Sequence, residues 1–265
     1  MQDLRSEMTD YYNSSSDYAK MLSRHGEEYF SHYVNYVRRF VEPPAVILDL
    51  GCGRGVSSKV LSEHGYDVIG LDLSWLFLRG TSSGRYLVAD ASRLPFPDST
   101  FDAVAGFEFI EHVPAADKVL DESLRVLKPE GRIILLGPNM LSPFHCVKQC
   151  INLALKRVEP HHIFGTASFD ALQKAASRIK AIRKRLASDT VTFEYVTPNL
   201  GKVGGDHDCV FLANPVEISK YLQSAGCEII SCGFGRGTAS RLIATCAPNY
   251  CGSTAIAARK KGGQR

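Results

Sequence analysis

Residues 46–55 of this chain, VILDLGCGRG, combine three glycines with one acidic residue in a spacing typical of a cofactor site. The apolar part predicts a buried strand, and the glycines that follow would let a ligand lie against the backbone of a tight turn. A dinucleotide fold would place its third glycine at position 56, which is Val56, and the Asp49 carboxylate would repel a pyrophosphate. The same carboxylate suits a cation. The pattern therefore favours S-adenosylmethionine, which carries an ammonium and a sulfonium but no phosphate.

Two further acidic residues, Asp72 and Asp90, follow the second and third predicted strands. A carboxylate in the position of Asp72 can accept hydrogen bonds from both ribose hydroxyls of an adenosine. The alternative for Asp72 is a helix N-cap, for which Ser74 is the better candidate. Asp90, or the backbone N–H beside it, is placed to hydrogen-bond the adenine ring, and its alternative is an ordinary Asx turn.

The segment 108–112, Glu-Phe-Ile-Glu-His, holds the candidate catalytic residues. Methyl transfer from a sulfonium is an in-line displacement, so a protein has to align acceptor and methyl group and exclude water. A hydroxyl or amine acceptor also has to lose a proton, and we expect His112, next to Glu111, to be the base. The alternative is a histidine that is satisfied by a local carboxylate.

Seven strands and several helices are expected to position these residues. The leader, residues 1–41, is predicted to be helical because Tyr29, Tyr33, Tyr36 and Phe40 recur at helical spacing. Tyr11 and Tyr12 fall outside that period and are candidates to close over a cofactor. The predicted strands are 46–50, 67–71, 85–88, 101–107, 132–137, 227–233 and 253–259. The predicted helices of the main domain are 56–64, 116–127 (ending at Lys128–Gly131), 215–225 and 238–247.

The segments VILDLGCGRG, VIGLDLS, VADASRLPFPDSTFDAV, FEFIEHV and LKPEGRIILLGPN together resemble class I S-adenosylmethionine-dependent methyltransferases. Within that class they are most similar to the ubiquinone and menaquinone biosynthesis methyltransferases, which carry a methyltransferase type 11 domain. The resemblance covers residues 46–139. It implies an α/β fold with a Rossmann-like seven-stranded sheet, its last strand antiparallel, flanked by helices.

The resemblance also implies which residues contact the cofactor. These are Asp49, Gly51, Gly53, Asp72, Leu73, Asp90, Ala91 and Phe107 or Glu108. Tyr12 and Cys52 complete the predicted cofactor-binding set.

The segment 108–112 has a second resemblance of its own. Its pattern, Glu-x-x-Glu-His, is similar to the divalent-metal motif of small-RNA 3′-end methyltransferases and to one in ubiquinone O-methyltransferases. Glu108, Glu111 and His112 would then bind Mg²⁺ or Mn²⁺ with a fourth ligand from downstream. His207 is the best candidate for that ligand, followed by His161 and His162. We do not expect this metal, because Glu108 is needed near the cofactor.

Four regions are expected along the chain: a helical N-terminal cap at 1–42, the cofactor-binding half at 43–139, an insertion after the fifth strand at 140–214, and a C-terminal part at 215–265 that completes the sheet. The insertion is expected to form the lid of the acceptor site.

A basic helix is predicted at 172–186. Its apolar side is expected to consist of Leu172, Ala175, Ile179, Ile182 and Leu186. We expect a solvated lid helix; the alternatives are contact with an anionic acceptor, with membrane headgroups or with RNA. The predicted basic residues are Lys174, Arg178, Lys180, Arg183, Lys184 and Arg185.

The composition favours a cytoplasmic protein. The net charge is only +3, the N-terminus lacks a signal-peptide pattern, and no apolar run approaches the length of a membrane span. The eight cysteines include no Cys-x-x-Cys pair, and we expect them to be reduced thiols.

The predicted function is transfer of the methyl group of S-adenosylmethionine to a small-molecule acceptor, at oxygen, with S-adenosylhomocysteine as product. Nucleic-acid bases are disfavoured as acceptors, because neither an [Asp/Asn]-Pro-Pro-[Tyr/Phe] signature nor a Pro-Cys nucleophile is present. One alternative is a metal-assisted, RNA-directed methyltransferase that uses Glu108, Glu111, His112 and His207. The other is a non-catalytic protein that binds S-adenosylmethionine or a protein partner.

Overall fold

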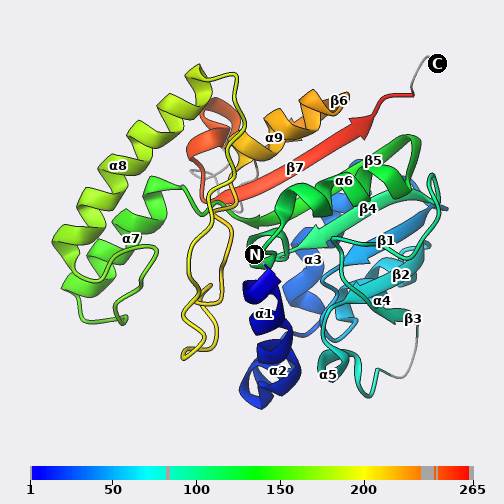
Figure 1. Cartoon of the computed structure of the whole chain (residues 1–265), viewed down its shortest axis with the longest axis horizontal. Helices are drawn as coiled ribbons and strands as arrows, with labels where there is room; N and C mark the ends of the chain where they lie inside the picture. Colours follow the sequence, from blue (N-terminus) through cyan, green and yellow to red (C-terminus); the bar gives the residue numbers. More distant parts are fainter. Residues whose placement is uncertain (1, 82–83, 234–241, 243, 263–265) are drawn as a thin grey trace.

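The computed structural model describes residues 2–81, 84–233, 242 and 244–262, with the backbone alone at residues 2 and 3. Its centre is one seven-stranded sheet with the strand order β3-β2-β1-β4-β5-β7-β6 (Figure 1). β7 runs antiparallel to both of its neighbours, while the pairs among β1 to β5 are parallel. The predicted α/β sheet with an antiparallel last strand is therefore confirmed. The strands are β1 Val46–Leu50, β2 Asp67–Asp72, β3 Arg85–Val88, β4 Phe101–Phe107, β5 Leu127–Pro138, β6 Cys227–Cys232 and β7 Ser253–Lys260.

Helices cover both faces of the sheet (Figure 1). Half of the predicted helix at 238–247 lies outside the described residues, since only 242 and 244–247 of it are described. No helix in the described ranges is long and apolar enough to cross a membrane. The helices are α1 Gln2–Ser14, α2 Ser16–Leu22, α3 Glu27–Arg38, α4 Val56–Glu63, α5 Trp75–Leu78, α6 Ala116–Val126, α7 Pro143–Ala154, α8 Ser168–Ala187 and α9 Pro215–Ser224, with short 3₁₀ helices η1 Ile110–His112 and η2 Pro248–Tyr250.

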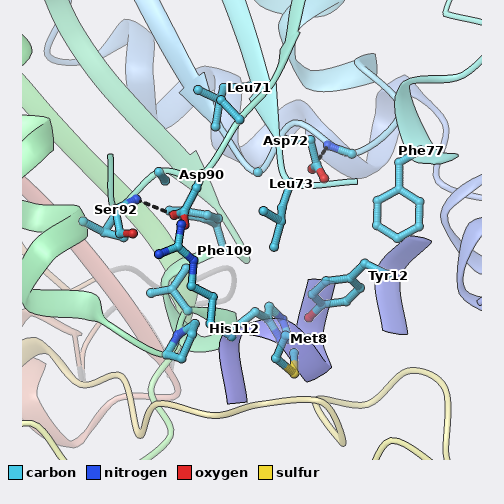
Figure 2. A pocket seen from close by; sticks show the side chains of 18 of the residues that line it. Met8, Tyr12, Leu71, Asp72, Leu73, Phe77, Asp90, Ser92, Phe109 and His112 are labelled. Atoms are coloured by element: carbon cyan, nitrogen blue, oxygen red, sulfur yellow. Dashed lines mark hydrogen bonds and ion pairs between the residues drawn. The ribbon is translucent and has the colours of Figure 1, made fainter. Parts of the chain in front are cut away.

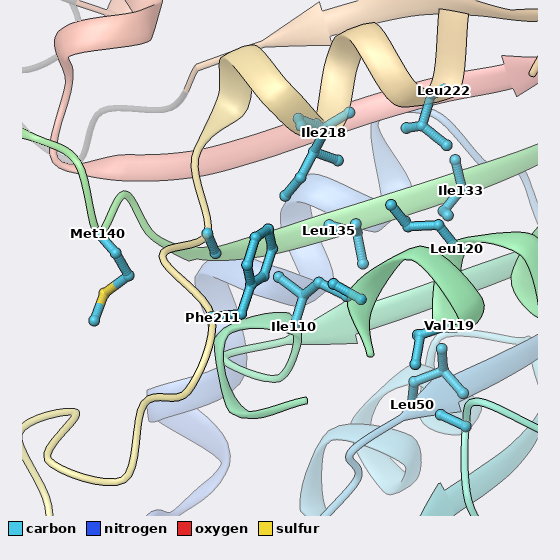
Figure 3. Packing of buried hydrophobic residues seen from close by; sticks show 14 of the residues in the cluster. Leu50, Ile110, Val119, Leu120, Ile133, Leu135, Met140, Phe211, Ile218 and Leu222 are labelled. Atoms are coloured by element: carbon cyan, nitrogen blue, oxygen red, sulfur yellow. The ribbon is translucent and has the colours of Figure 1, made fainter. Parts of the chain in front are cut away.

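The core has two layers because successive side chains of a strand point to opposite faces. In β1, Ile47 packs into one apolar cluster with Tyr33 and Val37 of α3. Its neighbour Leu48 packs into the other cluster, which includes residues of α6 and α9. Figure 3 shows this second cluster, where Leu120 of α6 and Ile218 and Leu222 of α9 lie near Ile133 and Leu135 of β5.

The fifth strand differs from the prediction. It begins at Leu127 rather than Arg132, because Leu127 pairs with Phe101 before the register shifts to pair Arg132 with Ala103. The segment Lys128–Gly131 is therefore a bulge within β5, whereas the sequence predicted the end of a helix there. The sheet overrides the local turn signal of Pro129 and Gly131.

The insertion contains the helical pair α7 and α8, which pack against each other at the end of the molecule opposite β1, β2 and β3 (Figure 1). The predicted apolar side of α8 is confirmed at Ala175 and Ile182 and wrong at Leu172, Ile179 and Leu186, which are exposed. The buried face also includes Ala171 and Arg178. Small alanines allow a neighbouring element to approach closely. The buried Arg178 guanidinium is satisfied because it donates to the carbonyls of Ser142 and Ile163, at 3.4 and 2.8 Å.

Candidate functional site

A cavity of about 320 Å³ lies at the carboxyl ends of the parallel strands. One wall comes from the loops after β1, β2, β3 and β4, and α1 and α2 supply another. Figure 2 shows Asp72 and Leu73 across the cavity from Met8 and Tyr12. Of the predicted cofactor residues, the lining includes Tyr12, Gly51, Gly53, Asp72, Leu73, Asp90, Ala91 and Glu108.

A steric contact explains why position 51 of the turn has to be a glycine. This residue has φ of +65°, and a Cβ built on it would lie 2.5 Å from Cδ2 of Phe109. Gly53 also has positive φ, and its N–H donates to Asp72 Oδ2 at 2.8 Å. The turn is therefore shaped by Phe109 and tied to the end of β2.

Asp49 lies beneath the turn rather than on the cavity wall. Its buried carboxylate accepts hydrogen bonds from Tyr33 (2.7 Å), Ser57 (2.6 Å) and Ser58 (2.7 Å). Burial raises the pKa of Asp49, and these three hydroxyls oppose the shift. The carboxylate therefore links α3, the turn and the first residues of α4.

Two other predicted cofactor residues are also absent from the cavity lining. Cys52 is buried, and its backbone N–H donates to the Leu71 carbonyl at 3.1 Å. Phe107 is buried and its ring stacks on Tyr33, with 5.3 Å between centroids. Glu108 does line the cavity, and its carboxylate accepts a hydrogen bond from Tyr29. The structure thus places Cys52 and Phe107, like Asp49, where they support the wall.

Asp72 faces the cavity with a partly satisfied carboxylate. It accepts backbone N–H bonds from Gly53 and from Ser74, the latter at 2.9 Å. Burial raises its pKa to about 6, although these backbone donors oppose the shift. Ser74 is the N-cap of α5, since its hydroxyl accepts from Phe77 N at 3.3 Å. The N-cap alternative for Asp72 is therefore wrong.

Asp90 combines two roles in this structure. Its Oδ1 accepts from Ser92 N at 2.7 Å, which is the Asx-turn geometry considered for it. Its Oδ2 forms an ion pair with Arg5 of α1. Figure 2 shows the Asp90–Ser92 bond at the cavity wall. Asp90 thereby joins the loop after β3 to the N-terminal cap, a contact that no local sequence pattern indicates.

His112 lies among carboxylates at the other end of the cavity. Its Nδ1 is 3.2 Å from Asp208 Oδ2, and its Nε2 is 3.9 Å from Glu111 Oε1. Asp208 Oδ2 also accepts a hydrogen bond of 2.8 Å from the Tyr12 hydroxyl. Tyr12, Asp208 and His112 therefore form a connected buried chain. Figure 2 shows His112 and Tyr12 on the α1 side of the cavity.

The protonation of this cluster is set by burial and charge. Burial lowers the pKa of His112, but the Asp208, Glu111 and Asp206 carboxylates outweigh it and raise that pKa to about 9. Burial raises the pKa of Glu111 to about 8. The Glu111 carboxylate has no hydrogen-bond partner among the described residues and does not line the cavity. Glu111 thus acts on His112 through its charge only when it is ionised, above a pH of about 8.

The backbone of Glu111 explains why Asp208 reaches the site. The Glu111 carbonyl accepts hydrogen bonds from Val210 N and Phe211 N, both at 2.9 Å. These bonds hold the end of the insertion against η1, directly after Asp208. The sequence pattern pointed to His207 as a metal ligand and gave no sign of a role for the neighbouring Asp208 carboxylate.

The metal set considered from the sequence is not assembled as expected. Asp206, rather than His207, lies beside Glu111 and His112, and the ligand atoms of these three residues lie within 4.8 Å of one another. His207 instead stacks on His161, with 4.2 Å between centroids and 21° between planes. Lone pairs of nearly parallel rings do not converge on one ion.

His161 has both ring nitrogens in use. Nε2 is 2.7 Å from the Gly205 carbonyl, and Nδ1 accepts from Ile163 N at 3.1 Å. Its pKa falls to about 4, mainly through burial. His161 therefore holds the insertion together in the neutral form. The group of His161, His162 and His207 is a structural stack in this conformation.

Comparison with known proteins agrees with this fold. Residues 48–135 match the family model described as a methyltransferase domain. The chain thus resembles class I S-adenosylmethionine-dependent methyltransferases in sequence and has their fold.

Curated relatives are similar over less than half of the chain. Demethylmenaquinone methyltransferase of Clavibacter sepedonicus is 38% identical over 43% of this chain and 49% of its own length. 2-Methyl-6-phytyl-1,4-hydroquinone methyltransferase of Synechocystis is 34% identical over 37% and 33%. Sterol 24-C-methyltransferase of Gibberella zeae is 32% identical over 45% and 32%. The chain spans half or less of the length of these relatives.

Solved structures match nearly the whole chain, although their identity is low. The 1,6-didemethyltoxoflavin-N1-methyltransferase of Burkholderia thailandensis has a TM-score of 0.56 at 16% identity, covering 98% of this chain and 88% of that one. An S-adenosylmethionine-dependent methyltransferase of Mesorhizobium loti has a TM-score of 0.53 at 16% identity, covering 89% and 99%. At this identity the likeness concerns the fold.

Proposed function

We propose that this chain transfers the methyl group of S-adenosylmethionine to a small-molecule acceptor, at oxygen. The observation that carries the proposal is one cavity that is lined by the glycine turn, Asp72, Asp90 and His112 together. Cofactor residues and a proton acceptor thus share a single space, which the in-line reaction requires. The named relatives, which are methyltransferases, support the class.

The cofactor would lie along the strand ends. The glycine turn at Gly51 and Gly53 would take the methionine part, and Asp72 would accept the ribose hydroxyls. Asp90 and Ala91 would contact the adenine, next to Arg5 of α1. At about 320 Å³ the cavity lies at the lower end of the ligand-pocket range, roughly 300–1,000 Å³. We therefore expect the cofactor to fill most of it and the acceptor to enter as α1 and α2 shift.

The reaction would proceed in one displacement. An acceptor oxygen attacks the methyl carbon, the carbon–sulfur bond breaks with its electron pair left on sulfur, and S-adenosylhomocysteine is released. The hydroxyl proton passes to His112, whose conjugate acid Asp208 stabilises. A base with a pKa of about 9 is matched to a phenol, whose pKa is about 10.

Carbon methylation is the second candidate. The sterol relatives are named for transfer to carbon 24, and other relatives are named for quinone-type compounds. A carbon acceptor also loses a proton, so His112 would keep its role. The product from a hydroquinone probe separates the two, because an O-methyl ether and a ring-methylated compound differ in their NMR spectra.

The experiment that tests the proposal has two stages. Calorimetric titration with S-adenosylhomocysteine should show binding that Asp72→Ala weakens. Turnover of S-adenosylmethionine with a panel of phenols and hydroquinones should then require His112. Cofactor binding without turnover of any acceptor would favour the non-catalytic alternative, and the absence of cofactor binding would contradict the proposal as a whole.

Two further expectations stay proposals. We propose a cytoplasmic location, which the eight free cysteines support because reduced thiols suit a reducing compartment. We also propose that the regions 1–42, 43–139, 140–214 and 215–265 act as cap, cofactor half, acceptor lid and sheet completion. The meeting of Tyr12 from the cap and Asp208 from the insertion beside His112 supports the cap and lid assignments.

A further inference from the structure

The helical pair α7 and α8 exposes an unusual share of the large apolar side chains. Among the described residues, nine of the fourteen exposed large hydrophobic side chains lie between residues 144 and 186. We call these nine the hairpin face: Phe144, Val147, Ile151, Leu155, Val158, Phe169, Leu172, Ile179 and Leu186.

On α7 the normal amphipathic pattern is inverted. Phe144, Val147, Ile151 and Leu155 recur at three- and four-residue steps and are all exposed, Ile151 to 54%. The buried residues of this helix are only Pro143 and Cys146. On α8, Phe169 and Leu172 are also apolar and exposed, with exposed fractions of 71% and 51%. A helix that turns its aliphatic stripe outward requires a partner for that stripe.

The same stretch concentrates positive charge. Residues 143–187 contain nine lysines and arginines and two acidic residues, whereas the rest of the chain contains 22 basic and 26 acidic residues. Arg178 and Arg185 are used inside the molecule, Arg185 in ion pairs with Glu194 and Glu217. Lys180, Arg183 and Lys184 have no ion pair among the described residues. They therefore remain available to an external anion.

We propose that the hairpin face docks on an anionic lipid surface. Exposed aliphatic side chains and unpaired lysines and arginines on the same two helices suit the boundary between headgroups and acyl chains, where the apolar groups enter and the cations stay with phosphate. The charge argues against a second copy of this chain, because two such faces would place like charges together. RNA would pair with the cations, but it offers no apolar partner to Ile151, Leu155 or Leu172.

Docking by this face leaves the cofactor cavity free. None of the nine side chains lines that cavity, which is bounded by α1, α2 and the strand ends. Vesicle binding is therefore separable from cofactor binding. The proposal stands whether or not the proposed reaction is correct.

The test is flotation of the full chain with phosphatidylcholine vesicles, with and without phosphatidylglycerol. We expect binding that needs the anionic lipid and weakens as salt increases. Lys180→Gln, Arg183→Gln and Lys184→Gln together should lower the partition coefficient roughly a hundredfold at low salt. Ile151→Ser with Leu172→Ser should lower it roughly tenfold.

Matched controls carry the same changes away from the hairpin face. Val88→Ser with Ile230→Ser removes two exposed aliphatic side chains from β3 and β6. Arg24→Gln, Arg38→Gln and Lys261→Gln together remove three exposed cations. These controls should bind vesicles like the parent chain. All variants should keep the parent's circular dichroism and its affinity for S-adenosylhomocysteine.

Three results would overturn the proposal. The first is no flotation with anionic vesicles, and the second is equal loss of binding in the hairpin variants and their controls. The third is preference for another occupant: an RNA oligonucleotide that displaces the chain from vesicles, or a dimer that the hairpin variants dissociate and that does not bind lipid.

Discussion

His112 Nδ1 lies 3.2 Å from Asp208 Oδ2, although the two residues belong to the loop after β4 and to the end of the insertion. Because the Tyr12 hydroxyl donates to the same oxygen, three distant segments meet at one carboxylate. The proton acceptor of the proposed reaction is thus assembled from the cap, the central domain and the insertion.

Replacing Asp208 should alter the titration of His112. Asp208→Asn removes the carboxylate that most raises the pKa of His112, so this pKa should fall. His112 would then become neutral at lower pH, and the rising limb of the pH–rate profile should move to lower pH. We also expect turnover to slow roughly tenfold to a hundredfold at its optimum, because a weaker base receives the proton.

The control for Asp208→Asn is Asp189→Asn, at an exposed position in the same insertion. It should leave both the rate and the profile unchanged. A slower Asp208→Asn enzyme with an unshifted profile would assign Asp208 a purely structural role.

Asp72→Ala should weaken the binding of S-adenosylhomocysteine by ~1–3 kcal/mol, the range for a lost charged hydrogen bond. The reason is that Asp72 faces the cavity with a carboxylate held by two backbone N–H groups. Calorimetric titration measures the change, and Asp98→Ala, at an exposed carboxylate, provides the control. Equal affinities for the parent and Asp72→Ala would remove Asp72 from the cofactor site.

Stability should depend on pH through Glu111 and His112. Both groups have raised pKa values in the folded chain, about 8 and about 9, so the folded state holds protons that the unfolded state releases. Their contribution is complete below the unfolded pKa of Glu111, about 4.5, and is lost as pH rises through 8 and 9. The free energy of unfolding should therefore fall across this window.

Glu111→Gln isolates the carboxyl contribution. Glutamine is neutral throughout, so denaturant titrations of this variant should show a smaller fall in the free energy of unfolding between pH 5 and 8 than the parent shows. Parallel curves for the two proteins would contradict a raised pKa at Glu111.

Removal of divalent metal should not affect the reaction. His207 is stacked away from Glu111 and His112, so the expected four-ligand set is not formed. Turnover with a phenol acceptor should be the same in chelator-treated and Mg²⁺-supplemented protein. Loss of turnover with chelator and its recovery with Mn²⁺ would instead assign a metal to Glu111, His112 and Asp206.

Gly51→Ala should destabilise the fold by roughly 1–3 kcal/mol, because the residue has φ of +65° and its new Cβ would meet Phe109 near the base of that side chain. Thermal unfolding measures the loss. The double change with Phe109→Ala removes the contacts with Cδ2 and Cγ, so it should recover part of the steric cost and leave the 3.0 Å contact with Cβ and the cost of the positive φ. No recovery would show that Phe109 is not what excludes a side chain at position 51.

The sequence by itself predicted which residues of the strand ends line the cavity. Gly51, Gly53, Asp72 and Asp90 each lie at or shortly after the end of one of the parallel strands, and such strand ends meet at one edge of the sheet. The seven strands could be predicted because hydrophobic runs and turn residues are local signals, whereas the antiparallel direction of β7 was implied only by the resemblance to class I methyltransferases. Only the start of β5 differed by more than one residue, because pairing between Leu127 and Phe101 overrode a turn signal.

The tertiary structure alone decided the other half. Which carboxylate meets His112, which residue pairs with Asp90 and which face of α8 is buried all depend on contacts between segments far apart in the chain. Asp208 reaches His112 because backbone hydrogen bonds to the Glu111 carbonyl fix the end of the insertion. Arg178 can be buried because its guanidinium donates hydrogen bonds to the carbonyls of Ser142 and Ile163. The periodicity of a sequence shows that a helix has an apolar and a polar face, but only the packing of the folded chain determines which face is buried.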